Sequence, residues 1–302
     1  MLQRFPPVRL AALDLDGTLL SRHGEITPAT RAAIARAVEH GVVVVPATGR
    51  PLASLPPVVA QLPGIRYAIT SNGAAVWDLG SDPLGAVYSR YSNAAQHQTS
   101  EPVCLLHDLM PAETARAAFA VCEACRADLR IFADGRAHTD NYSIEYAAMR
   151  FARRGNTEAR QPNDGRFTIV RDPAEWMSRH AHEVEKMCVF FGSVELTNAA
   201  MPRFQALPGV EIVQGSPENI EVTAAGVDKG NALLALADLL GIPRENTLAV
   251  GDSENDRAML EKAGIAAVMA NGMPQIRAIG DIVSEADCNH DGVAELFQKL
   301  GI

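Results

Sequence analysis

Cysteine is scarce in this sequence of 302 residues, which holds five and therefore an odd number. An odd count in a long chain argues against a disulfide framework and fits reduced thiols better. Cys122 and Cys125 have the spacing of a redox or zinc motif, but they lie in an alanine-rich run, residues 113–126, that is typical of a helix. No second pair of this kind occurs in the sequence. We therefore expect helix thiols there instead of a metal or redox centre.

Long apolar runs are also lacking. The runs at residues 42–45 and 233–240 are far shorter than the roughly 20 residues that cross a bilayer. The first seven residues carry one basic side chain and no apolar stretch of signal-peptide length. We expect a cytoplasmic protein with no membrane partner.

Positive charge is in deficit, because 27 lysines and arginines face 36 aspartates and glutamates, for a net charge of -9. Broad binding to nucleic acid requires positive surface that neutralises phosphates, so we expect no nucleic-acid partner. Hydrophobic residues at 47% and charged residues at 21% exclude the composition of a disordered chain. The length favours two packed units with at least one sizeable core.

Apolar runs alternate with helix-type segments in the first part of the chain. Residues 8–13, 42–45 and 67–70 have the continuous apolar pattern of buried strands. Thr27 and Pro28 form a helix start between the first two, a cap followed by proline at the first helical position. This alternation predicts an α/β fold, a doubly wound parallel sheet covered on both faces.

The same alternation returns after about residue 220, with helix patterns at 228–240 and 255–263 and strand patterns at 247–250 and 265–269. Between residues 84 and 218 the strands look amphipathic and charge runs occur. We therefore expect a catalytic core of residues 1–83 and 219–302, interrupted by an inserted α+β cap domain at 84–218. Within the insert, the pattern of residues 149–164 predicts a solvated loop.

Polar motifs follow the predicted strands at their carboxyl ends, where parallel sheets bind ligands. The first is Asp14-Leu15-Asp16-Gly17-Thr18. Two aspartates at this spacing point the same way if the strand continues, so that one can attack while the other transfers a proton. Alone, the motif would be more typical of a simple turn.

Three further motifs occur in order: Thr48-Gly49-Arg50, Lys229-Gly230, and Gly251-Asp252-Ser253-Glu254-Asn255-Asp256. Together the four motifs resemble those of the haloacid dehalogenase superfamily. The Ser-Asn-Gly-Ala turn at Asn72 and the large insert resemble in particular the Cof-type subfamily of sugar-phosphate phosphatases. The match extends over nearly the whole predicted core.

The resemblance implies a magnesium-dependent phosphatase. Asp14 would attack phosphorus, and Asp16 would protonate the leaving oxygen and then activate the water that hydrolyses the aspartyl phosphate. Thr48 and Lys229 would complete the catalytic set as donors to the phosphate. The substrate-binding residues implied are Thr48, Gly49, Arg50, Asn72, Lys229 and Asn255.

The same resemblance implies a Mg²⁺ site made by the Asp14 and Asp252 carboxylates, the Asp16 carbonyl, and Asp256 either directly or through water. A physical reason supports a cation here, because aspartates gathered at one place repel one another. Oxygen ligands with retained waters are what magnesium prefers.

Several alternatives stay open. Thr48 fits a helix cap, Lys229 a solvated helix start, Arg50 a partner for an acid, and Asn72 a turn. A phosphomutase of the same superfamily would use both aspartates, and a catalytically silent phosphate-binding regulatory protein could share the scaffold. A dehalogenase is disfavoured because Asp16 is present. The expected partner is a small phosphorylated metabolite, the expected assembly a monomer or homodimer, and the cap would select the leaving group.

Overall fold

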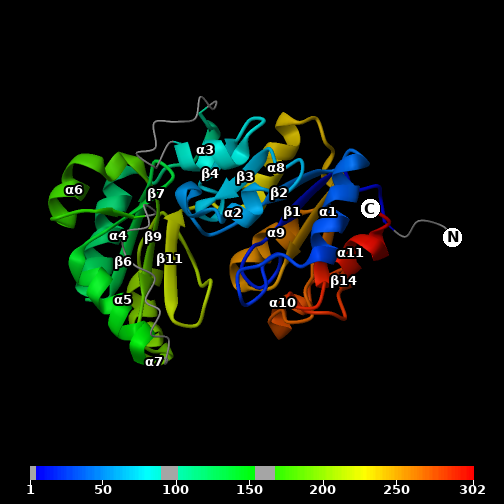
Figure 1. Ribbon diagram of the computed structural model, residues 1–302. Helices are drawn as coiled ribbons and strands as arrows, with labels where there is room; N and C mark the ends of the chain where they lie inside the picture. The colour runs from blue at the N-terminus through cyan, green and yellow to red at the C-terminus, as the bar shows by residue number, and fades with distance from the viewer. Residues whose placement is uncertain (1–4, 90–100, 154–166) are drawn as a thin grey trace. The chain divides into compact units, whose positions relative to one another are not determined.

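The computed structural model describes residues 5–89, 101–153 and 167–302 (Figure 1). The described residues form two compact units, one within Met1–Arg50, Leu55–Leu106 and Asp228–Ile302, the other within Pro51–Ser54 and His107–Val227. The sequence pattern places the boundaries at 83/84 and 218/219. The difference arises from strand pairing. The strand Val103–His107 joins a sheet of the first unit, and the strand that starts at Asn219 joins the sheet of the second.

The first unit is built on a five-stranded parallel sheet. Its order is β14-β13-β12-β1-β2. Every residue of β1 and β13 is buried, as the continuous apolar pattern predicts for a sheet covered on both faces. The strands are β1 (Leu10–Leu13), β2 (Val43–Pro46), β12 (Thr247–Gly251), β13 (Ile265–Val268) and β14 (Ile282–Val283).

Helices cover this sheet on both faces. From β1 the chain crosses to β2 through one helix, and from β12 it crosses to β13, in the opposite direction, through another. Right-handed crossovers in opposite directions place these helices on opposite faces. The predicted doubly wound α/β fold is therefore confirmed. The helices of the unit are α1 (Pro28–Glu39), α2 (Pro57–Ala60), α3 (Pro83–Ser89), α8 (Lys229–Leu239), α9 (Arg257–Lys262), α10 (Pro274–Arg277) and α11 (Gly292–Leu300), with short 3-10 turns at Ser71–Gly73, Arg244–Asn246 and Glu254–Asp256.

The start of α1 shows how local sequence fixes these elements. The Thr27 hydroxyl accepts a hydrogen bond from the Thr30 amide, and Pro28 occupies the first helical position, where its missing N–H costs nothing. Ala33, Ile34 and Ala37 then face the core. The helix ends before Gly41, which has a φ of +83° that glycine adopts without strain.

The register of the parallel strands brings the polar motifs to one edge. Leu13 pairs with Val250 on one side and with Pro46 on the other. The residues that follow these strands therefore lie at the same carboxyl edge. A separate three-stranded sheet, β3-β4-β5, adds a further turn beside it through the bridge between Ala47 and Ile69. Its strands are β3 (Tyr67–Thr70), β4 (Ala75–Asp78) and β5 (Val103–His107).

The second unit is a six-stranded mixed sheet with helices. Its strand order is β10-β11-β9-β6-β7-β8, and only β7 and β8 pair in parallel. The sheet contains β6 (Asp128–Ala133), β7 (Arg136–Thr139), β8 (Phe167–Ile169), β9 (Val184–Phe190), β10 (Val210–Val213) and β11 (Asn219–Ala224). The helices are α4 (Ala112–Ala124), α5 (Asn141–Arg153), α6 (Pro173–His180) and α7 (Val194–Gln205), with 3-10 turns at Leu52–Ser54 and Ala181–Glu183.

One expectation for this unit is wrong in part. The loop predicted at 149–164 is helical up to Arg153, while residues 154–166 lie outside the described residues. Ala147 and Arg150 are three residues apart on α5 and both are buried. The Arg150 guanidinium donates to Asp128, which is also buried, so an arginine that suggests a solvated segment serves instead to pack the helix.

Cys122 and Cys125 lie at the end of α4 and just beyond it. Cys122 is buried, and that burial raises the pKa of its thiol. Its Sγ lies 4.0 Å from the Met187 sulfur. Its packing is therefore that of a core side chain.

A buried ion pair crosses the second sheet. Lys186 on β9 donates to Glu221 on β11 at 2.9 Å, and the Lys186 ammonium lies 4.7 Å from the Phe132 ring centroid. Asn219 donates to the same carboxylate at 2.9 Å. Both charged side chains are buried, so each depends on the other for neutralisation.

We expect Glu221→Leu to destabilise the second unit by about 3–5 kcal/mol, because it removes the carboxylate that neutralises a buried ammonium. Urea unfolding would measure the loss. The double variant Lys186→Met/Glu221→Leu is the matched control and should recover most of it, since neither charge is then buried. Equal losses in the single and double variants would contradict this account.

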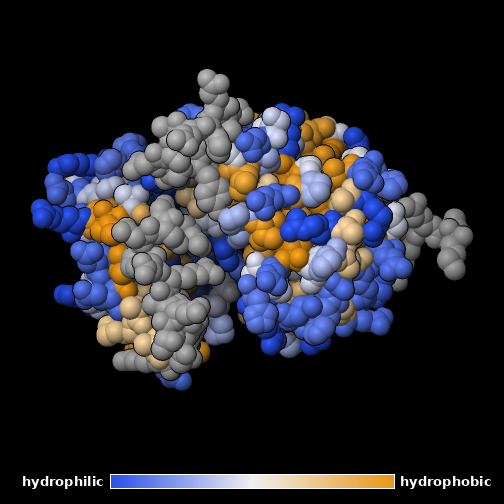
Figure 2. All heavy atoms as spheres, in the orientation of Figure 1, coloured by the Kyte–Doolittle hydropathy of each residue, from blue (hydrophilic) through white to orange (hydrophobic). Residues whose placement is uncertain are grey.

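The surface of the first unit is mainly polar around its C-terminal elements. Figure 2 shows hydrophilic residues gathered over α10 and β14. The large apolar side chains that are exposed in the described parts of the chain are Val103, Leu105, Tyr142, Met149, Ile169, Val194, Leu196 and Leu239. None of the helices described has the length and apolar character needed to cross a membrane.

Candidate active site

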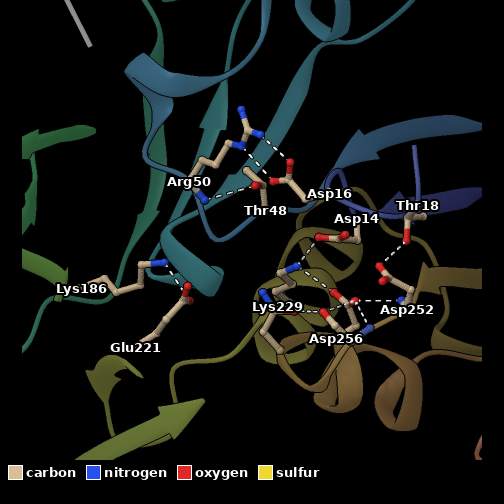
Figure 3. Close-up of polar contacts among 12 residues, drawn as sticks. Asp14, Asp16, Thr18, Thr48, Arg50, Lys186, Glu221, Lys229, Asp252 and Asp256 are labelled. Carbon is tan, nitrogen blue, oxygen red and sulfur yellow. Dashed lines mark hydrogen bonds and ion pairs between the residues drawn. The ribbon is translucent and has the colours of Figure 1, made fainter. Parts of the chain in front are cut away.

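Asp14 lies directly after β1 and is buried at the carboxyl edge of the sheet (Figure 3). Its amide donates to Val250 O at 2.9 Å, which continues the β1 ladder and fixes the residue. Its Oδ1 accepts a hydrogen bond of 2.6 Å from Lys229 Nζ. The structure thus brings together two of the predicted catalytic residues, which are 215 positions apart in the sequence.

Lys229 is fully buried between two carboxylates. Its Nζ donates to Asp14 Oδ1 and, at 2.7 Å, to Asp256 Oδ1. Asp228 caps the helix that Lys229 begins. At Gly230 a Cβ would lie 2.3 Å from the Ala258 carbonyl, so the glycine allows α8 and α9 to approach closely. The alternative that Lys229 is a solvated lysine at a helix start is therefore wrong.

Asp256 uses both of its carboxylate oxygens within the protein. Oδ1 accepts from Lys229, while Oδ2 accepts from the amides of Asp252 and Ser253 at 3.0 Å each. Its side chain is completely buried. These contacts orient the lysine and fix the turn that carries Asp252.

Thr18 and Gly17 position Asp252, a role that the sequence alone did not indicate. The Thr18 hydroxyl donates to Asp252 Oδ1 at 3.0 Å. Gly17 has a φ of +95°, and a Cβ there would lie 2.6 Å from Asp252 Oδ2. The Asp252 side chain therefore packs directly against the backbone of Gly17, and only a glycine leaves room for this contact. The Asp-Gly-Thr sequence of the first motif is the signal for these contacts, although it also fits a simple tight turn.

The carboxylates of this cluster carry more negative charge than Lys229 neutralises, and the pKa values of Asp14 and Asp252 are raised. Burial, then the charge of Asp256, raises the pKa of Asp14 well above its ordinary value, although Lys229 opposes the shift. Burial, followed by Asp256, raises the pKa of Asp252 to about 7. The pKa of Lys229 is raised, because its two carboxylate partners outweigh burial.

The donor set fits a hard divalent cation. Carboxylate oxygens of Asp14, Asp252 and Asp256 all lie within 4.8 Å of one another. Among the described residues, the hydrogen bonds to Asp14 and Asp252 fall on Oδ1 of each, so Oδ2 of each is the oxygen available to a cation. Oxygen ligands of this kind suit Mg²⁺.

The metal-free protein should lose stability as the pH rises from 5 to 8. A raised folded pKa at Asp252, about 7, means that the folded state binds a proton that the unfolded state has already released above its ordinary value of 3.8. Stability is then fully present below that ordinary value and is lost as the pH rises through 7, by on the order of a few kcal/mol. Melting temperatures in a chelator would measure the loss.

Two comparisons isolate this effect. His138, whose pKa burial lowers, acts in the opposite sense over the same range, so wild type is compared with Asp252→Asn. The variant should show a flatter pH dependence, and Mg²⁺ should flatten that of wild type because it binds the ionised carboxylates. Parallel curves for wild type and variant in the chelator would refute the assignment.

Asp16 and Arg50 form a forked ion pair beside this cluster. Arg50 Nε donates to Asp16 Oδ2 at 2.9 Å, and its Nη2 donates to Oδ1 (Figure 3). Arg50 thus takes the role of a partner for an acid that the sequence left open. Asp16 is 60% exposed, so this pair contributes little to stability.

The remaining predicted residues lie around the same edge. Thr48 is buried, and its hydroxyl accepts from the Arg50 amide at 3.1 Å, across Gly49. Asn72 is buried with a left-handed φ of +59°, and its backbone N–H donates to the Thr48 carbonyl at 3.1 Å. Asn255 Oδ1 accepts from the Ser253 hydroxyl at 2.7 Å, within its own turn. A role for these four in binding substrate stays a prediction.

Comparison with known proteins gives consistent matches over most of the chain. The sequence pattern of the haloacid dehalogenase-like hydrolases matches residues 11–297. The chain is 26% identical to the 5-amino-6-(5-phospho-D-ribitylamino)uracil phosphatase YcsE of Bacillus subtilis, covering 96% of this chain and 95% of that protein. It is 30% identical to the HMP-PP phosphatase of Cronobacter sakazakii, covering 89% of this chain and 87% of that one.

Among solved structures, a HAD subclass IIB sugar phosphatase superposes with a TM-score of 0.75 at 24% identity, covering 97% of this chain and 99% of that chain. At this identity the likeness is evidence for the fold alone.

Proposed function

Because this chain belongs to the haloacid dehalogenase-like hydrolases, we propose that it removes phosphate from small phosphorylated metabolites with Asp14 as a covalent nucleophile. The observation that carries the proposal is the buried Asp14 carboxylate, held 2.6 Å from Lys229 and grouped with Asp252 and Asp256. The predicted enzyme class, a phosphoric monoester hydrolase, is confirmed by the family match and by relatives named phosphatases.

In the first step, an Asp14 oxygen forms a bond to phosphorus while the bond between phosphorus and the ester oxygen breaks. Asp16 gives its proton to that leaving oxygen. Since Arg50 holds the Asp16 carboxylate in the structure, this step requires the pair to open so that Asp16 can carry a proton. Lys229 favours the ionised, nucleophilic form of Asp14.

In the second step, water attacks the phosphorus of the aspartyl phosphate and Asp16 takes its proton. Inorganic phosphate leaves and the Asp14 carboxylate is restored. Thr48 and Lys229 supply donors to the phosphoryl oxygens, which carry the negative charge in the transition state.

Mg²⁺ would be held by Asp14, Asp252 and the Asp16 carbonyl. When bound, it supplies positive charge that offsets the phosphoryl oxygens and the clustered carboxylates. Asp256, whose oxygens are engaged by Lys229 and two amides, acts in this proposal by orienting the lysine. We assign selection of the leaving group to the second unit.

A substrate panel tests the proposal. Phosphate release is measured with Mg²⁺ on hexose phosphates, pyridoxal phosphate, nucleotides and flavin mononucleotide, together with the two compounds for which the relatives above are named. Release from at least one of these, abolished by a chelator and restored by Mg²⁺, is expected. Isomerisation of a bisphosphate without net release would indicate a phosphomutase, and activity undiminished by the chelator would sink the metal-dependent mechanism.

A further inference from the structure

A turn after β13 contacts both halves of the acidic cluster. The Met273 amide donates to the Asp252 carbonyl at 2.9 Å, and the Met269 amide donates to the Gly251 carbonyl at 3.1 Å. This turn therefore holds the backbone of the second acidic motif. It also carries Asn271, whose side chain reaches the first motif.

Asn271 bridges two segments through its amide group. Its Nδ2 donates to the Gly17 carbonyl at 2.8 Å, and its Oδ1 accepts from the Cys288 amide at 3.0 Å. The Cys288 contact orients the amide, so that the nitrogen faces Gly17. Gly17 directly follows Asp16, whose carbonyl belongs to the predicted metal site, and it lies against Asp252.

We propose that Asn271 is a positioning residue that sets the distance between the two halves of the metal site, and that it thereby sets the affinity for Mg²⁺. This inference rests on the proposed function. The turn is hydrogen-bonded to Asp252 through Met273 and to Gly17, next to Asp16, through Asn271. One short segment therefore holds the backbone at both predicted metal ligands in place. Residues that orient metal ligands without touching the metal commonly contribute to affinity.

Asn271 is exposed, so its removal leaves no cavity and should cost little packing. Its contribution to the site can therefore be separated from its contribution to folding. Asn246 provides a matched control, because its Nδ2 likewise donates to a distant backbone carbonyl, that of Pro7, at 2.7 Å and away from the aspartates.

The test measures Mg²⁺ binding by calorimetry and the melting temperature in a chelator for wild type, Asn271→Ala, Asn271→Asp and Asn246→Ala. Asn271→Asp keeps an acceptor for Cys288 but loses the donor to Gly17. Its added negative charge would by itself favour a cation, so weaker binding in this variant points to the lost bond.

We expect the dissociation constant for Mg²⁺ to rise by about tenfold in both Asn271 variants. Their metal-free melting temperatures should equal that of Asn246→Ala, whose Mg²⁺ affinity should match wild type. Their activity should recover at saturating Mg²⁺. Wild-type affinity in both Asn271 variants would overturn the inference while leaving the proposed function intact. A wild-type protein that binds no Mg²⁺ would overturn the proposed function itself.

Discussion

The Asp14→Asn variant should lose phosphatase activity by about 10⁴-fold or more, the order of loss seen when a covalent nucleophile is removed from other hydrolases. An amide oxygen is a far weaker nucleophile than a carboxylate. The substitution keeps the shape of the side chain, and Lys229 can still donate to the amide oxygen. Steady-state kinetics on the best substrate of the panel would measure the loss.

Trapping experiments separate loss of the nucleophile from loss of the fold. With Mg²⁺, beryllium fluoride or aluminium fluoride should form an adduct on Asp14 of the wild type and none on the variant. Asp238→Asn is the control, because Asp238 lies exposed on α8 and should keep full activity. An adduct on another residue would remove Asp14 from the mechanism.

The sequence sufficed for the parallel sheet because its strands follow simple rules. Strands buried on both faces have unbroken apolar runs, and every residue of β1 and β13 is buried. Residues 67–70 also form the predicted strand, β3, but it belongs to the separate three-stranded sheet and pairs antiparallel with β4. Parallel strands end at one edge, so Asp14, Thr48 and Asp252 could be expected together before any distance was known. Both features follow from short stretches of sequence and from the general geometry of parallel sheets.

The contacts that complete the site could not be read in the same way. The hydrogen bond from Thr18 to Asp252 joins residues 234 positions apart, and the sequence around one residue does not indicate the other as its partner. Arg150 illustrates the reverse error, because a charged residue in a charged run is usually solvated. Its burial depends on Asp128, a partner in a strand that the pattern did not pair with it.

The boundaries predicted for the insert differ from those of the second compact unit for a related reason. Asn219 follows a turn and precedes the returning α/β pattern, so sequence alone assigns it to the core. In the structure it pairs with Phe190 on β9, because β11 finds its hydrogen-bond partners in the mixed sheet. Strand pairing is a long-range choice that an apolar run does not encode.

Lys229→Met should destabilise the metal-free protein by about 3–5 kcal/mol, since it leaves two buried carboxylates without the cation between them. The loss should be larger at pH 8 than at pH 5. Without Lys229 the pKa of Asp14, already raised by burial and by Asp256, rises further, so the folded state binds protons that the unfolded state has released. Urea unfolding at both pH values, in a chelator and in Mg²⁺, would measure the loss of stability, its pH dependence and its recovery by the cation.

Mg²⁺ should restore part of the stability of this variant, because the cation replaces some of the missing positive charge. Activity should stay low by about 10³-fold even at saturating Mg²⁺, because a donor to the phosphoryl oxygens is also lost. Lys299→Met is the control, since Lys299 pairs with Glu295 on the surface and should cost less than about 1 kcal/mol. If Lys229→Met were no less stable than this control, the lysine would not be what holds the acidic cluster together.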